Sequence, residues 1–127
     1  MKNTFIALIL LLATTSPALA ENSVIFYGKP SKKIEIYEQE SRVFILSPKE
    51  QEEYKVIISK RNGRYYWSSR DNVELELHTS GIYQTYVAKT GSGYVRVSNA
   101  TAHHSNSEYS YSEHLILGFN SITYFGR

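Results

Sequence analysis

The 127-residue chain contains no cysteine, only one tryptophan and one methionine, and no large excess of either charge. The lack of cysteine excludes disulfides, thiol catalysis, zinc sites built on thiolates and a lipid anchor on an N-terminal cysteine. Fourteen basic and twelve acidic residues give a formal net charge of +2 with histidine neutral. This balance argues against nucleic acid as a partner, because neutralising phosphates requires a concentrated basic surface.

Long apolar runs are also absent, apart from one short run at the N-terminus. A basic residue precedes an apolar segment over residues 5–13, and a proline and the small-residue sequence Ala-Leu-Ala at 18–20 follow it. An apolar run of about nine residues is far shorter than the ~20 that a membrane-spanning helix needs. We therefore interpret residues 1–20 as a signal peptide. The rest, 21–127, is expected to be a single β domain, periplasmic or secreted and not inserted in a membrane.

The remaining chain alternates apolar and polar residues with the period of two that β-strands show. Between Val73 and Leu77 the odd-numbered residues are apolar and the even-numbered ones are glutamates. Short strands separated by turn residues are typical of all-β proteins, so we expect a small antiparallel sandwich or barrel of about seven to nine strands. The expected strands cover 34–37, 42–46, 54–60, 64–67, 73–77, 82–89, 94–97, 108–117 and 122–125.

Three local motifs indicate turns, a helix and a loop. Asn62-Gly63 stands between two β-prone segments and predicts a type I′ hairpin turn, because both residues tolerate positive φ. Ser47-Pro48-Lys49-Glu50 matches a capping box with proline at the first helical position, and predicts one or two helical turns over 48–54. A connecting turn is the alternative there. The polar segment Asn99–Ser107 is expected to be the longest exposed loop.

No catalytic or metal-binding motif is recognisable, so we assign no catalytic residue, cofactor or metal ligand. The chain has four histidines, at His78, His103, His104 and His114. They show none of the spacings typical of zinc sites, and the sequence lacks the G-x-S-x-G elbow that would strain a serine nucleophile into place. Candidate carboxylates for a hydrolase are Glu35, Glu74, Glu76 and Glu113. Nothing in the sequence marks an apolar cleft around any of them.

Aromatic residues are abundant, with eleven tyrosines, five phenylalanines and one tryptophan. Tyrosine and tryptophan either fill a small β core or form a rigid binding surface, and the sequence leaves both uses open. We expect Trp67, at a strand end, to pack into the core, whereas an exposed Trp67 beside Arg70 would anchor a ligand. The candidate ligand-binding residues are Tyr65, Trp67, Arg70, Tyr109 and Tyr111.

Several segments of the C-terminal half carry a resemblance to other proteins. The segments are Tyr66-Trp67-Ser68-Ser69-Arg70, Ser80-Gly81-Ile82-Tyr83, Gly91-Ser92-Gly93-Tyr94-Val95-Arg96-Val97, Glu113-His114-Leu115 and Thr123-Tyr124. Their W-x-S-R, S-G-x-[YF] and G-S-G-Y-[VI]-R-V pattern resembles one in a group of small exported proteins of Gram-negative bacteria. The resemblance implies export and a β fold, and it implies no activity.

Two classes of function remain open at this point. The first is a monomeric, non-enzymatic exported binding protein for an envelope glycan, a peptide or a secreted protein, with inhibition of a secreted hydrolase as one form of it. The second is a small secreted or periplasmic hydrolase that uses glutamate and histidine side chains. The two classes differ in whether those side chains converge in an apolar cleft.

Overall fold

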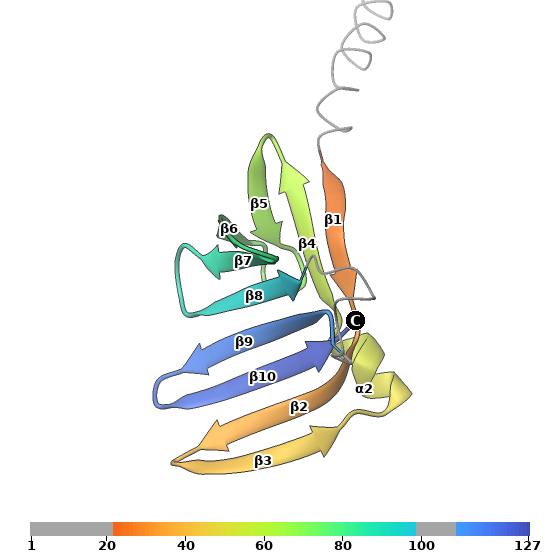
Figure 1. Ribbon diagram of the computed structural model, residues 1–127, viewed down its shortest axis with the longest axis vertical. Helices are drawn as coiled ribbons and strands as arrows, with labels where there is room; N and C mark the ends of the chain where they lie inside the picture. The colour runs from red at the N-terminus through yellow and green to blue at the C-terminus, as the bar shows by residue number, and fades with distance from the viewer. Residues whose placement is uncertain (1–21, 99–108) are drawn as a thin grey trace, which may run out of the picture.

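The computed structural model describes residues 22–98 and 109–127 (Figure 1). The expected signal peptide, 1–20, and the expected loop Asn99–Ser107 lie outside these residues. The described residues form ten antiparallel strands and one short helix. The elements are β1 (Ser23–Gly28), β2 (Pro30–Tyr37), β3 (Glu40–Ile45), α2 (Pro48–Glu53), β4 (Val56–Arg61), β5 (Arg64–Trp67), β6 (Val73–Ser80), β7 (Tyr83–Ala88), β8 (Gly93–Ser98), β9 (Tyr111–Leu117) and β10 (Asn120–Gly126).

All ten strands belong to one sheet, in the order β1-β4-β5-β6-β7-β8-β9-β10-β2-β3. The expected all-β class, with antiparallel strands and one short helix, is confirmed. The sheet curls without closing, so the architecture is one open sheet where the sequence favoured a sandwich or barrel. The strand missed by the sequence reasoning is β1, whose register shifts between Val24 and Phe26. A bulge of this kind breaks the strict alternation by which strands are recognised.

The curl brings β1 close to β9 and to the end of β10. β1 continues into β2 through Lys29, although the two strands stand far apart in the sheet order. The Lys29 backbone N–H donates to the Arg127 carbonyl at 3.0 Å, and the Arg127 N–H donates back at 3.3 Å. On β1 the Phe26 ring packs edge-on against the Tyr111 ring of β9, with 5.2 Å between centroids. The corner between β1 and β2 is therefore held at the end of β10.

One face of the strands lies inside the curl and forms the core. Its buried residues come from β4 through β9 and are Val56, Ile58, Trp67, Leu75, Tyr86, Val95 and Tyr111. The alternation expected for β6 is confirmed, because Leu75 is buried whereas Glu76 is exposed. Every strand from β4 to β9 thus contributes at least one side chain to a single core.

The two local motifs of the N-terminal half fold as the sequence indicates. Asn62 has φ 52° and Gly63 has φ 77°, and they join β4 to β5 in the expected hairpin. Before α2, the Glu50 backbone N–H donates to Ser47 Oγ at 3.3 Å, and the Ser47 N–H donates to Glu50 Oε1 at 3.1 Å. The capping box satisfies backbone groups that a six-residue helix would otherwise leave without partners.

Replacing the turn glycine tests this hairpin. A Cβ at Gly63 would meet nothing within 4 Å, so the substitution adds backbone strain and no clash. We expect Gly63→Val to lower the free energy of unfolding by about 1–2 kcal/mol, because a β-branched residue is strained at positive φ. Gly63→Asn should cost less, since asparagine tolerates the left-handed region. Equal stability of Gly63→Val and the parent in a denaturant titration would contradict the turn geometry.

Candidate binding surface

Glu113 is the only charged side chain that is fully buried among the described residues, with 0% of its surface exposed. It lies on β9, and its cross-strand neighbours are Val95 on β8 and Tyr124 on β10. On its own strand the alternation places it on the same face as Tyr111 and Leu115. A carboxyl group in such surroundings requires compensating donors, because burying a charge is costly.

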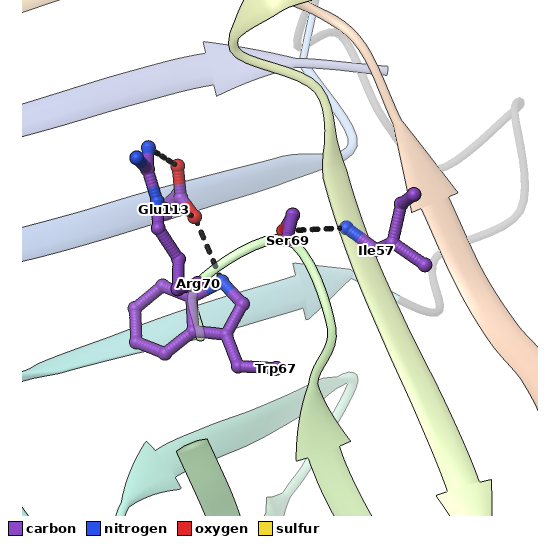
Figure 2. A network of polar contacts seen from close by, with 5 residues as sticks. All are labelled: Ile57, Trp67, Ser69, Arg70 and Glu113. Carbon is purple, nitrogen blue, oxygen red and sulfur yellow. Dashed lines mark hydrogen bonds and ion pairs between the residues drawn. The ribbon is translucent and has the colours of Figure 1, made fainter. Parts of the chain in front are cut away.

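Three donors surround the Glu113 carboxylate (Figure 2). The Trp67 indole Nε1–H donates to Oε2 at 2.8 Å, the Arg70 Nε–H donates to Oε2 at 3.2 Å, and Arg70 Nη2 donates to Oε1 at 2.9 Å. Burial raises the pKa of the Glu113 carboxyl, while Arg70 and Trp67 act in the opposite direction. Because every partner is a donor, the arrangement matches the ionised carboxylate.

The loop that carries Arg70 is fastened to β4. The Ser69 backbone N–H donates to the Ile57 carbonyl at 3.4 Å, and Ser69 Oγ accepts a hydrogen bond from the Ile57 N–H at 2.9 Å (Figure 2). Asp71 and Asn72, both with φ 54°, then turn the chain into β6. Asparagine and aspartate adopt this conformation more readily than other non-glycine residues. The loop therefore holds the guanidinium in a fixed position.

From Arg70 a row of cations and rings continues along the inner face towards β2. The Arg70 guanidinium lies 5.6 Å from the centroid of the Tyr124 ring, and Tyr124 stacks on Tyr54 with 5.3 Å between centroids. Lys33 Nζ lies 5.9 Å from the Tyr54 ring centroid and 3.0 Å from Glu35 Oε1. Cation–ring contacts of this kind stabilise partly buried side chains. The row connects the buried carboxylate to the surface of β2.

The row ends beside a hollow near the turn between β2 and β3. The hollow has a volume of about 460 Å³ and is lined by Glu35, Tyr37, Glu38, Glu40 and Arg42. Three of these residues are acidic and one is basic, so the hollow is suited to basic groups rather than to anions.

Next to the hollow, exposed apolar side chains gather at two neighbouring hairpin turns. Tyr37 precedes the turn between β2 and β3 and is 63% exposed, while Leu117 and Phe119 at the turn between β9 and β10 are 58% and 101% exposed. The two turns lie at the same edge of the molecule (Figure 1), and the Glu38 backbone N–H donates to Asn120 Oδ1 at 3.2 Å. We refer to Tyr37, Leu117 and Phe119 as the tip surface. This hydrogen bond limits the movement of one turn relative to the other.

The structure buries two of the sequence-derived candidate residues and leaves Tyr65, Arg70 and Tyr109 partly exposed. Trp67 is 2% exposed and Tyr111 is 4% exposed, so neither offers a ligand a usable surface. Arg70 is engaged by Glu113, and Tyr65 is half-buried against the Tyr86 ring at 5.4 Å. The expectation that Trp67 packs into the core is confirmed. Trp67 and Arg70 do meet, but on a buried carboxylate rather than on an open face.

Tyr109 stands apart from the other candidates, with its ring 5.5 Å from that of Phe125. Sequence reasoning named Glu113 only as one of four candidate carboxylates and did not place it in the core, and it missed the tip surface. The signal for Glu113 was its position between Tyr111 and Leu115 in an apolar register. The signal for Phe119 was its position after Gly118 in a short turn, where a ring has little to pack against.

In the described part of the chain, no glutamate and histidine come together in an apolar cleft, because the one such pair in contact, Glu76 and His78, is exposed. Glu113 and His114 are consecutive on β9 and therefore point to opposite faces of the sheet. His114 Nε2 lies 2.8 Å from Ser112 Oγ, and Nδ1 lies 3.3 Å from Thr123 Oγ1. Burial lowers the pKa of His114, and the positive charge of Arg96 adds to that effect. Among residues 22–98 and 109–127 no carboxylate contacts the ring, in contrast to a serine–histidine–aspartate triad.

The other histidines offer no metal site that the structure describes. His78 Nε2 lies 3.8 Å from Glu76 Oε2, and both side chains are exposed. His103 and His104 lie outside the described residues. Within those residues, no group of three or more histidine, cysteine, aspartate or glutamate side chains could hold a metal ion.

Comparison with protein-family models, with curated proteins and with solved structures gave no match. None of the helices formed by the described residues is long and apolar enough to cross a membrane.

Removing the guanidinium tests the role of the buried carboxylate. We expect Arg70→Leu to lower the free energy of unfolding by about 3–5 kcal/mol, because Glu113 is then a buried charge without its cation. The double variant Arg70→Leu with Glu113→Leu should recover most of that loss, since no charge is left to compensate. Denaturant titration of the parent and the two variants measures both effects. Equal losses in Arg70→Leu and in the double variant would show that packing, not charge, is responsible.

The same variant should respond to pH in a defined direction. In Arg70→Leu the folded-state pKa of Glu113 lies above its unfolded value of about 4.3. Burial raises this pKa, and the guanidinium that would lower it is missing. The folded state then binds the proton more tightly, so the destabilisation is full at neutral pH and shrinks as pH falls through that raised pKa. A deficit that stays constant between pH 7 and pH 5 would contradict this reasoning.

Proposed function

We propose that the protein is an exported, non-enzymatic binding protein, that its ligand is another protein, and that the tip surface makes the central contact. The observation that carries this proposal is Phe119, which is 101% exposed in the two-residue turn between β9 and β10. Aromatic side chains presented in this way are the typical anchors of protein interfaces, where they fill a pocket of the partner.

The setting of Phe119 supports the same proposal. Leu117 and Tyr37 extend the apolar area, and the hydrogen bond from Glu38 to Asn120 fixes the two turns before a partner binds. A surface fixed in advance loses less conformational entropy on binding. The acidic hollow beside Tyr37 would form a charged rim, so a partner with an apolar pocket and basic residues around it fits best.

The hydrolase alternative has less support from the geometry. A general acid or base must reach a substrate, but the Glu113 carboxylate is fully buried and accepts hydrogen bonds from two side chains. The contact between Ser112 and His114 is the one feature that favours a nucleophilic serine. It lies on the outer face of β9, on the opposite side of the sheet from Glu113.

Substitution at the tip tests the proposed function. Immobilised parent protein, Phe119→Ala and Ile82→Ala are incubated with the same envelope extract and culture medium of the host. Ile82 is a suitable control because it is 50% exposed in the turn between β6 and β7, at the opposite end of the strands. We expect the parent and Ile82→Ala to retain the same protein and Phe119→Ala to bind it at least about tenfold more weakly, as loss of a central aromatic anchor implies. Equal retention by Phe119→Ala, or no specifically retained protein, would contradict the proposal.

A further inference from the structure

In the described part of the chain the sheet has two edge strands, β1 and β3, and they differ in how well they could accept another strand. Within residues 22–98 and 109–127, β1 pairs only with β4, and the bulge between Val24 and Phe26 interrupts its register. Within the same residues β3 pairs only with β2, its register has no interruption, and all six of its residues are exposed. Bulges protect edge strands from pairing with other chains, and β3 lacks this protection. β3 is therefore the edge on which a further strand can add.

The backbone groups that β3 offers can be identified from its turn. Glu38 and Gln39, with φ 47° and 73°, form a two-residue turn that closes on the pair Tyr37 and Glu40. In an antiparallel ladder the residues that bond to the neighbouring strand alternate with residues whose backbone groups point away. The even-numbered residues of β3 therefore form the hydrogen bonds to β2. The next even-numbered residue, Leu46, continues this alternation, because its N–H donates to the Ser31 carbonyl at 2.9 Å. The outward backbone groups therefore belong to three odd-numbered residues, Ser41, Val43 and Ile45.

We propose that β3 pairs antiparallel with β3 of a second copy of this chain, around a two-fold axis that passes through Val43. A two-fold contact places each surface against itself, so residue i faces j and j faces i. With the axis at Val43, Ser41 faces the partner's Ile45, Val43 faces the partner's Val43, and Ile45 faces the partner's Ser41. This register uses all three outward-facing residues of β3 on both chains.

Side-chain complementarity selects the same register. On the inner face Arg42 would lie opposite the partner's Phe44, twice by symmetry, and arginine over an aromatic ring is favourable. Moving the axis to Arg42 would instead place Arg42 against the partner's Arg42, and like charges directly opposite are destabilising. Moving it to Phe44 would leave Ser41 without a partner residue on β3, because its counterpart would lie beyond Ile45.

The outer face adds apolar area to the same contact. Val43 and Ile45 are 57% and 79% exposed on β3, and Ile36 on β2 is 41% exposed. Ile116 of β9 is 45% exposed on the same face, and Ser121 of β10 lies between it and Ile36. Exposed apolar patches of this kind mark interaction sites. Pairing around Val43 would make the patches of the two copies continuous, which is a different contact from the tip surface at Phe119.

Disulfide crosslinking of single-cysteine variants can test this register directly, because the chain has no cysteine of its own. Two Val43→Cys residues on the axis would have Cα atoms about 5.5 Å apart, within the range that a disulfide spans. In Ile45→Cys the two cysteines would lie four residues apart along the paired strands, about 13 Å, which a disulfide cannot bridge. Ile45 is the more exposed of the two positions, so random collision would favour Ile45→Cys.

Under mild oxidation we expect Val43→Cys to form a covalent dimer at least about tenfold faster than Ile45→Cys. Sedimentation equilibrium of the unmodified protein should give twice the mass of one chain. Val43→Pro should sediment as a monomer with an unchanged β circular dichroism spectrum, because the N–H it removes points away from β2. A monomer at every concentration of the unmodified protein would overturn the proposal. So would an Ile45→Cys variant that crosslinks as fast as Val43→Cys.

Discussion

The contact between Trp67, Arg70 and the buried carboxylate of Glu113 is the constraint on which the shape of this protein depends. Trp67 ends β5, Glu113 lies on β9, and three strands separate them in the sheet. With strands about 4.8 Å apart, a flat sheet would hold the two residues about 19 Å from each other. Trp67 Nε1 lies only 2.8 Å from Glu113 Oε2, so the sheet must curl until β5 faces β9. The cost of burying the charge is offset by hydrogen bonds from an indole and a guanidinium.

Other close approaches follow from that curl. Phe26 of β1 reaches Tyr111 of β9, and a Cβ at Gly28 would lie 2.4 Å from the Tyr111 ring, so only glycine fits there. At the same corner, a Cβ at Gly126 would lie 2.1 Å from the Lys29 carbonyl oxygen. With the corner between β1 and β2 held in this way, β9, β10, β2 and β3 extend as a fan (Figure 1). The proposed tip surface lies at the turns of that fan, and the proposed pairing edge is its last strand.

Much of this structure could be predicted from the sequence, because strands, turns and caps depend on neighbours along the chain. The alternation in β6, the turn at Asn62-Gly63 and the capping box at Ser47 are local signals, and each is confirmed. The curl was not predictable, since the partner of Glu113 lies 43 residues away at Arg70. Two of the candidate binding residues, Trp67 and Tyr111, belong to the core, because composition cannot tell a buried ring from an exposed one.

Hydrogen exchange of the Trp67 indole N–H is the most direct test of the claim that this contact holds the curl. The chain has one tryptophan, so its indole proton gives one assignable NMR signal. If the contact with Glu113 opens only when the sheet unfolds, the free energy of protection should equal the free energy of unfolding from denaturant titration. Exchange with a much smaller free energy, while the amides of β5 and β9 stay protected, would show that the contact opens on its own and does not hold the sheet.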